Sequence, residues 1–119
     1  MRRPPDTGAS LPHAVQACHD LIVWIIPHVD QFPRLRRFTL GERLESNLLL
    51  VLERLTEAAY ARQRRELLRE ANAKVAVARH LWRMAWEMRL VPERSFHHGA
   101  TLLVDLGRQI GGWYKSSAE

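Results

Sequence analysis

Clustered arginines offer the first candidate chemistry of this chain. The stretch FPRLRRFTLGERLE, residues 32–45, places three arginines within four positions and continues directly into an apolar pattern typical of a core helix. Guanidinium groups bind phosphate or carboxylate oxygens through a forked, two-point contact. Sixteen of the eighteen cationic residues are arginine. The sequence therefore favours binding of an anionic partner over the making or breaking of bonds.

The six histidines offer a second candidate chemistry, metal binding or acid–base catalysis. Four of them are scattered along the chain: His13, His19, His28 and His80. None of these has a cysteine or carboxylate partner at a recognised ligand spacing. His97 and His98 are adjacent, and neighbours on a helix point about 100° apart, so they cannot chelate one ion. Zinc-protease, thiol-redox and nucleotide-loop motifs are absent from the sequence. We expect no enzyme activity, catalytic residue, metal site or cofactor.

Length and composition favour one soluble globular domain. The chain has 119 residues, of which 46% are hydrophobic and 26% charged, enough to bury a core. No apolar run approaches the roughly 20 residues that cross a membrane, and residues 1–11 lack the apolar region of a signal peptide. The single cysteine, Cys18, cannot form an internal disulfide, which favours a reducing cytoplasm.

Apolar residues recur at helical spacing along most of the chain, without the alternation typical of strands. We expect an all-α, up-down-up-down four-helix bundle over residues 11–115, with a disordered tail at 1–10 and a second tail at 116–119. The expected helices cover about 12–31, 39–59, 65–89 and 92–113, the second opening with the capping box Thr39–Glu42. We expect a kink or early end at Pro27. The predicted core positions are Leu11, Val15, Cys18, Ile22, Ile25, Val29, Phe32, Leu40, Leu44, Leu48, Val51, Leu55, Ala58 or Ala59, Leu68, Ala71, Val75, Ala78, Trp82, Ala85, Leu103, Leu106, Ile110 and Trp113.

Positive charge is concentrated in residues 62–89, where seven arginines and one lysine against three glutamates give a net +5. A helical projection places six residues of this segment in one stripe beside the apolar face: Arg65, Arg69, Asn72, Ala76, Arg79 and Arg83. We expect no acidic residue on the stripe before Glu87. Arg62 and Arg64 extend it, while Arg34, Arg36 and Arg37 are expected in the connection before the second helix, all as one cationic surface.

A plainer interpretation of the stripe is a solvated helix face, with some arginines paired to Glu53 and Glu57 of the second helix. Apolar residues outside the core positions also have two interpretations. They belong to a wide core with loosely packed edges, or they mediate self-association through the second, third and fourth helices. The run 48–52 is apolar around the whole helix, and Leu81, Met84, Trp86 and Met88 add to the third helix. Gly107, Gly111 and Gly112 permit close backbone approach in the fourth.

Four stretches carry a family resemblance: LIVWIIPHVDQFPR, FPRLRRFTLGERLE, EAAYARQRRELLREAN and LGRQIGGWYK. In this order, from about Cys18 to Lys115, they resemble the accessory variability determinant (Avd) proteins of diversity-generating retroelements. Related four-helix proteins are encoded by intervening sequences in bacterial 23S rRNA genes, and this chain is more similar to the retroelement type. The larger residues Trp82, Met84 and Trp86 depart from the smaller aliphatic or polar residues expected there.

The resemblance implies a non-enzymatic protein that forms a homopentameric barrel and binds the retroelement reverse transcriptase, RNA and DNA. Such a complex copies template RNA into mutagenised cDNA. Basic positions implied by the resemblance are Arg36, Arg37, Arg62, Arg65, Arg79 and Arg83. The projection alone adds Arg34, Arg64 and Arg69. Two alternatives remain: a structural oligomer whose arginines form only intersubunit salt bridges, and an rRNA intervening-sequence type of RNA-binding protein without a reverse transcriptase.

Overall fold

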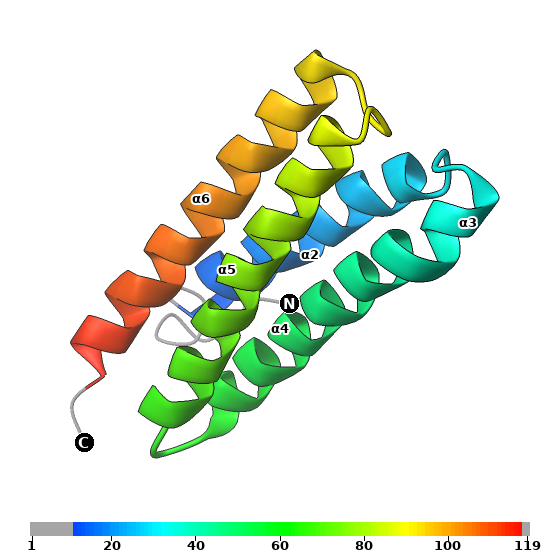
Figure 1. Cartoon of the computed structure of the whole chain (residues 1–119). Coiled ribbons are helices and arrows are strands. Elements are labelled where there is room, and N and C mark those ends of the chain that lie inside the picture. The colour runs from blue at the N-terminus through cyan, green and yellow to red at the C-terminus, as the bar shows by residue number, and fades with distance from the viewer. Residues whose placement is uncertain (1–10, 118–119) are drawn as a thin grey trace, which may run out of the picture.

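The chain folds into four long helices in the computed structural model, which describes residues 11–117 (Figure 1). The elements are α2 (Leu11–Val29), α3 (Arg34–Arg36), the π-helical turn η1 (Arg37–Gly41), α4 (Glu42–Tyr60), α5 (Arg65–Glu87) and α6 (Glu93–Ser116). No β-strand occurs within the described range, which confirms the all-α prediction. The predicted tail at 1–10 and residues 118–119 of the second lie outside it, and α6 continues through Ser116.

The long helices pack in the cyclic order α2, α4, α5, α6, each against the two beside it. In Figure 1, α5 and α6 lie side by side and run in opposite directions, α4 flanks α5, and α2 lies behind. Short connections between antiparallel neighbours are characteristic of an up-down-up-down bundle, as the sequence predicts. This arrangement places α5 between α4 on one side and α6 on the other.

The core follows the predicted apolar positions closely. Every predicted position of α4, α5 and α6 is buried, with Ala58 in place of the alternative Ala59. In α2, Ala14 and Leu21 widen the buried face, while Val15 is half-buried. Each fully buried aliphatic side chain contributes about 1.5–3 kcal/mol relative to exposure. Burial of one continuous cluster therefore fixes which side of each helix faces solvent.

The predicted capping box at Thr39 is wrong, because the chain is already helical before that residue. Helical turns begin at Arg34, and the backbone N–H of Glu42 donates to the carbonyl of Arg37, five residues earlier. Thr39 Oγ1 donates backwards to the Leu35 carbonyl at 3.0 Å instead of capping a helix. Side-chain bonds of this kind compete with capping. The three arginines of the opening stretch thus lie on helical turns and not in an extended connection.

Two glycines allow close helix contacts, and they are not the ones predicted from the sequence. A Cβ at Gly99 would lie 2.6 Å from Trp82 Nε1, and one at Gly41 would lie 2.8 Å from Val29 Cγ1. By contrast, a Cβ at Gly107 would lie at an ordinary 3.5 Å from Asn72 Oδ1. Gly99 therefore lets α6 close onto the Trp82 indole, whose N–H donates to the Phe96 carbonyl at 2.9 Å.

Helix ends differ from the predicted bounds at two places. Pro27 lies inside α2, and the helix ends two residues later at Val29, before the predicted bound of residue 31. Proline lacks the N–H of the helical bond four residues back, which weakens the last turn. Helix α5 ends at Glu87, and Arg89 adopts a positive φ of 64°. The Leu90 N–H then donates to the Ala85 carbonyl at 2.8 Å, closing the helix end.

Several apolar side chains outside the core remain exposed. In the run 48–52, Leu48 and Val51 are buried, whereas Leu49 is 44% exposed, so the apolar circumference of α4 is not covered within the described chain. On α5, Met84 and Met88 are 44% and 41% exposed. Trp86 is half-buried instead, because its ring stacks on Phe96.

Candidate functional site

The nine predicted arginines lie in two groups along the chain. Arg34, Arg36 and Arg37 lie on α3 and η1, whereas Arg62, Arg64 and Arg65 lie where the chain enters α5. Figure 1 shows these two places at opposite ends of the bundle, separated by the length of α4. Nineteen helical residues span about 28 Å. We name these groups the entry cluster (34, 36, 37) and the α5 row (62, 64, 65, 69, 79, 83), and their use as one cationic surface stays a prediction.

The entry cluster surrounds an exposed aromatic ring. The guanidinium carbons of Arg34 and Arg37 each lie 5.8 Å from the Phe38 ring centroid, within the range of a cation–π contact. Arg37 Nη1 also donates to the Asp30 backbone carbonyl at 3.4 Å. Phe38 is 58% exposed and Leu35 is 75% exposed. This end of the bundle thus presents apolar and cationic groups together to solvent.

The first arginines of the α5 row are anchored on aromatic rings of α6. Arg65 lies over the Tyr114 ring at 4.0 Å, and Arg64 lies 5.8 Å from the Trp113 ring centroid. Arg64 Nη2 donates to the Ala61 carbonyl at 2.9 Å, while its Nε is buried without a hydrogen-bond partner. These contacts hold both side chains against the bundle. Arg62 is exposed.

Two arginines of the row form ion pairs with glutamates of their own helix. Arg69 donates to Glu66 at 2.5 Å, and Arg83 Nε donates to Glu87 at 3.0 Å. Residues three or four apart on a helix can reach sideways across the stripe, which the projection ignores. The Arg69 hydrogen bond lowers the pKa of Glu66 below its usual value. Both pairs are exposed, and such pairs contribute little to stability.

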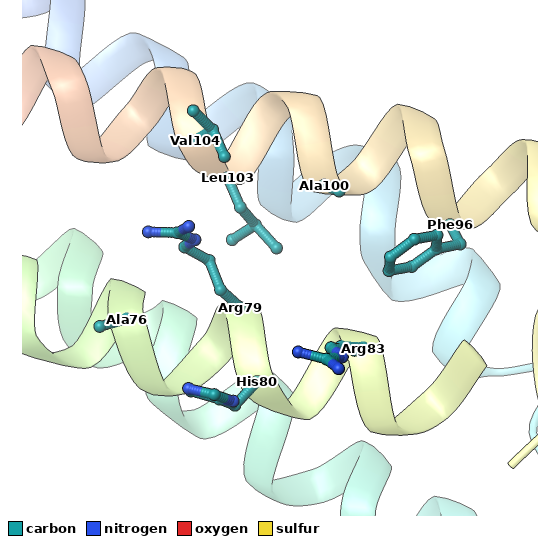
Figure 2. A pocket seen from close by; sticks show the side chains of 8 residues that line it. All are labelled: Ala76, Arg79, His80, Arg83, Phe96, Ala100, Leu103 and Val104. Carbon is teal, nitrogen blue, oxygen red and sulfur yellow. The ribbon is translucent and has the colours of Figure 1, made fainter. Parts of the chain in front are cut away.

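Arg36, Arg62 and Arg79 form no ion pair with any carboxylate of residues 11–117. Arg79 lines a pocket, an open hollow of about 290 Å³ between α5 and α6. Figure 2 shows the residues around it: Ala76, Arg79, His80 and Arg83 from α5, and Phe96, Ala100, Leu103 and Val104 from α6. Arg79 and Arg83 thus share a pocket whose α6 side is entirely apolar.

On the other side of α5, where it packs against α4, the arginine is paired with carboxylates. Arg54 Nε donates to Glu70 of α5 at 2.9 Å and its Nη1 lies 3.6 Å from Glu57. Arg54 is half-buried, so this pair is less screened by solvent than the pairs on the exposed faces. This interhelical pair has its arginine on α4 and its carboxylate on α5, the reverse of the pairing considered from the sequence.

Sequence reasoning missed Phe96 and its stack with Trp86. The ring centroids lie 4.4 Å apart with an interplanar angle of 11°. His97 lies beside both rings, and its Nε2 is 3.4 Å from Glu93. The available signal was an aromatic residue on each side of the connection at residues 88–92, which brings the end of α5 to the start of α6.

Three of the histidines, His28, His97 and His98, lie against aromatic rings. Trp24 lies against His28 at 4.1 Å and against His98 at 4.8 Å between ring centroids. His97 and His98 therefore point to different neighbours, as their adjacency on one helix predicts. Within residues 11–117, no three His, Cys, Asp or Glu side chains gather to hold a metal ion. Burial raises the pKa of the Cys18 thiol to about 12, so it stays protonated and unreactive.

None of the helices over residues 11–117 is long and apolar enough to cross a membrane.

Comparisons with known proteins give one match. No curated protein and no solved structure matches this chain. A family model described as bAvd-like matches residues 14–117, which includes all four long helices and both arginine clusters. The match agrees with the resemblance carried by the four quoted stretches. The chain belongs to the bAvd-like family.

Proposed function

We propose that this protein is a non-enzymatic accessory subunit of a diversity-generating retroelement. It binds the retroelement reverse transcriptase and nucleic acid, and supports copying of template RNA into mutagenised cDNA. The observation that carries the proposal is the family match over residues 14–117. We place this role in the cytoplasm, where a single buried thiol such as Cys18 stays reduced.

The electrostatics of the bundle support a polyanionic partner. Arg36, Arg62 and Arg79 have no carboxylate partner within residues 11–117, so their positive charge is available to an incoming phosphate. Arg69 and Arg83 form exposed pairs that an oligonucleotide can displace at little cost. Helices α3 and α5 fix the spacing of these groups. Binding then releases counterions without a large ordering cost for the protein.

Exposed apolar groups support assembly of several copies. Leu49, Val77, Met84 and Met88 are each between 41% and 44% exposed. Apolar side chains gathered on helix faces are typical of protein interfaces. We propose a homo-oligomer, a pentamer as in the resembling family, whose repeated arginine clusters raise the affinity for a long polyanion.

A salt series tests the nucleic-acid part of the proposal. Affinity for a single-stranded RNA should fall linearly with the logarithm of salt concentration, with a slope of about −0.7 for each phosphate contacted. Co-purification with the reverse transcriptase encoded beside the gene tests the protein partner, and native mass tests the assembly. Absence of RNA binding at low salt would leave the alternative of a structural oligomer whose arginines pair between subunits.

A further inference from the structure

The pocket between α5 and α6 combines two features that simple phosphate binding does not require. Its α6 side consists of Phe96, Ala100, Leu103 and Val104, which offer no side-chain hydrogen-bonding group. Its α5 side carries Arg79 and Arg83. In Figure 2 the Arg79 guanidinium lies beside Leu103 and Val104, and the Phe96 ring lies at the other end of the pocket. A cationic rim around an apolar hollow suits a ligand with a flat apolar part and an attached anion.

The size and openness of the pocket favour a single planar group. Its volume of about 290 Å³ is at the lower end of the range, about 300–1,000 Å³, that is typical of small-ligand pockets. The Phe96 ring is half-buried and is held in place by its parallel stack on Trp86. A fixed aromatic ring loses little entropy when another ring packs on it. Arg79 adds a second planar surface, because guanidinium groups also stack on aromatic faces.

The spacing of the arginines matches a chain in which planar and anionic groups alternate. Arg79 and Arg83 are four residues apart, which separates them by about 6 Å along α5. This is close to one nucleotide step in an extended strand. Nearer the start of α5, an arginine and an aromatic ring also meet between α5 and α6, where Arg65 lies over Tyr114. Between them, Gly107 and Gly111 face Asn72 without side chains of their own. Cationic groups interleaved with stacking surfaces are the usual design of single-strand binding sites.

We propose that the α5–α6 groove binds single-stranded nucleic acid, with one base inserted into the Phe96 pocket and its flanking phosphates on Arg79 and Arg83. This inference rests on the proposed function and names its ligand class. A duplex would use the arginines and leave the pocket empty, since its bases are stacked inside the helix. An acidic protein segment would likewise need the charges but not a ring-sized apolar hollow. The α6 wall offers no hydrogen-bonding side chain, and Arg79 and Arg83 are assigned to the phosphates, which leaves only His80 of the lining side chains to contact a base edge. The site should therefore bind all four bases with weak sequence preference.

The test compares three ligands of equal length: a single-stranded oligodeoxythymidine, the same backbone without bases, and a duplex. The wild-type protein should bind the single strand about 5- to 150-fold more tightly than the abasic strand, the range equivalent to one stacked base. Ala100→Leu fills the pocket without removing charge and should abolish this preference. Ala73→Leu is the matched control, because Ala73 is an exposed alanine of α5 outside the pocket, and it should retain the preference.

Phe96→Leu supplies a second variant that keeps apolar volume but removes the stacking ring. It should lose most of the preference while abasic and duplex binding stay unchanged, and circular dichroism should confirm the fold of each variant. Equal affinity of the wild type for single and abasic strands would overturn the pocket and leave salt-dependent binding intact. If Ala100→Leu weakens binding of the reverse transcriptase instead of the oligonucleotide, the groove is a protein site. Failure of all three ligands to bind at low salt would instead contradict the proposed function.

Discussion

The two sides of α5 use arginine in different ways. Toward α4, Arg54 is half-buried and its charge is matched by Glu70 and Glu57. Toward α6, Arg79 faces Ala100 and Val104 and has no carboxylate partner within residues 11–117. Both sides carry arginine. They differ in the residues around it, which are carboxylates at Arg54 and apolar side chains of α6 at Arg79. The positive charge of Arg54 is therefore neutralised within the bundle, whereas that of Arg79 is available to a bound anion.

The largest expected effect follows from removing both arginines that line the pocket between α5 and α6. Arg79→Ala with Arg83→Ala should lower affinity for a single-stranded oligonucleotide by on the order of 100-fold at 50 mM salt, because two phosphate contacts are lost. The salt slope should become shallower by about 1.4. Helicity should stay unchanged, because both side chains are exposed. A double variant that fails to fold or assemble would show that these arginines are structural after all.

The next effect concerns the contact that holds α6 against α5. Gly99→Ala places a Cβ within 2.6–2.9 Å of the Trp82 indole, and overpacking of this kind costs about 1–3 kcal/mol. Thermal unfolding should show a lower Tm. Gly112→Ala is the control, since a Cβ there meets nothing within 4 Å. An unchanged Tm for Gly99→Ala would mean that the α5–α6 groove can widen freely.

A smaller effect of opposite sign is expected in the same groove. Gly107→Ala adds a Cβ at ordinary contact distance, 3.5 Å from Asn72 Oδ1. Replacing glycine in a helix interior should raise the free energy of unfolding by about 0.5–1 kcal/mol. Denaturant titration measures the change. A loss of stability would show that α6 approaches α5 more closely at Gly107 than the structure indicates.

The smallest effect is expected on the paired side. Arg54→Ala removes the link to Glu70 and should lower the free energy of unfolding by about 0.5–1 kcal/mol, as for a half-exposed ion pair. Its affinity for oligonucleotides should equal that of the wild type in the same salt series. Weaker oligonucleotide binding by this variant would contradict the inference that only the α6 side of α5 binds nucleic acid.

The core was predictable because burial follows the helical period. All predicted core positions of α5, from Leu68 to Ala85, are buried in the structure. The ion pairs Arg69–Glu66 and Arg83–Glu87 were missed, because a projection gives the direction of each Cβ but not the reach of a long side chain. Sequence spacing within one helix therefore predicts the apolar face better than the state of its charges.

The pocket could not be predicted, because it depends on the register between α5 and α6. That register is set by the connection at residues 88–92, where Arg89 adopts a positive φ. A glycine usually marks such a helix end, and arginine gives no comparable signal. The stack of Trp86 on Phe96 and the insertion of Trp82 against Gly99 then fix the alignment. Both contacts join α5 to α6, and the spacing of apolar residues within one helix does not predict which residues of two helices meet.

The π-helical turn η1 has a consequence for the entry cluster. One additional residue between Arg37 and Glu42 rotates everything before it by about 100° relative to the apolar face of α4. The direction in which the side chains of Arg34, Arg36 and Arg37 point therefore depends on the number of residues in η1. Family members that lack a single residue in this segment would keep the same arginines yet aim them at a different neighbour.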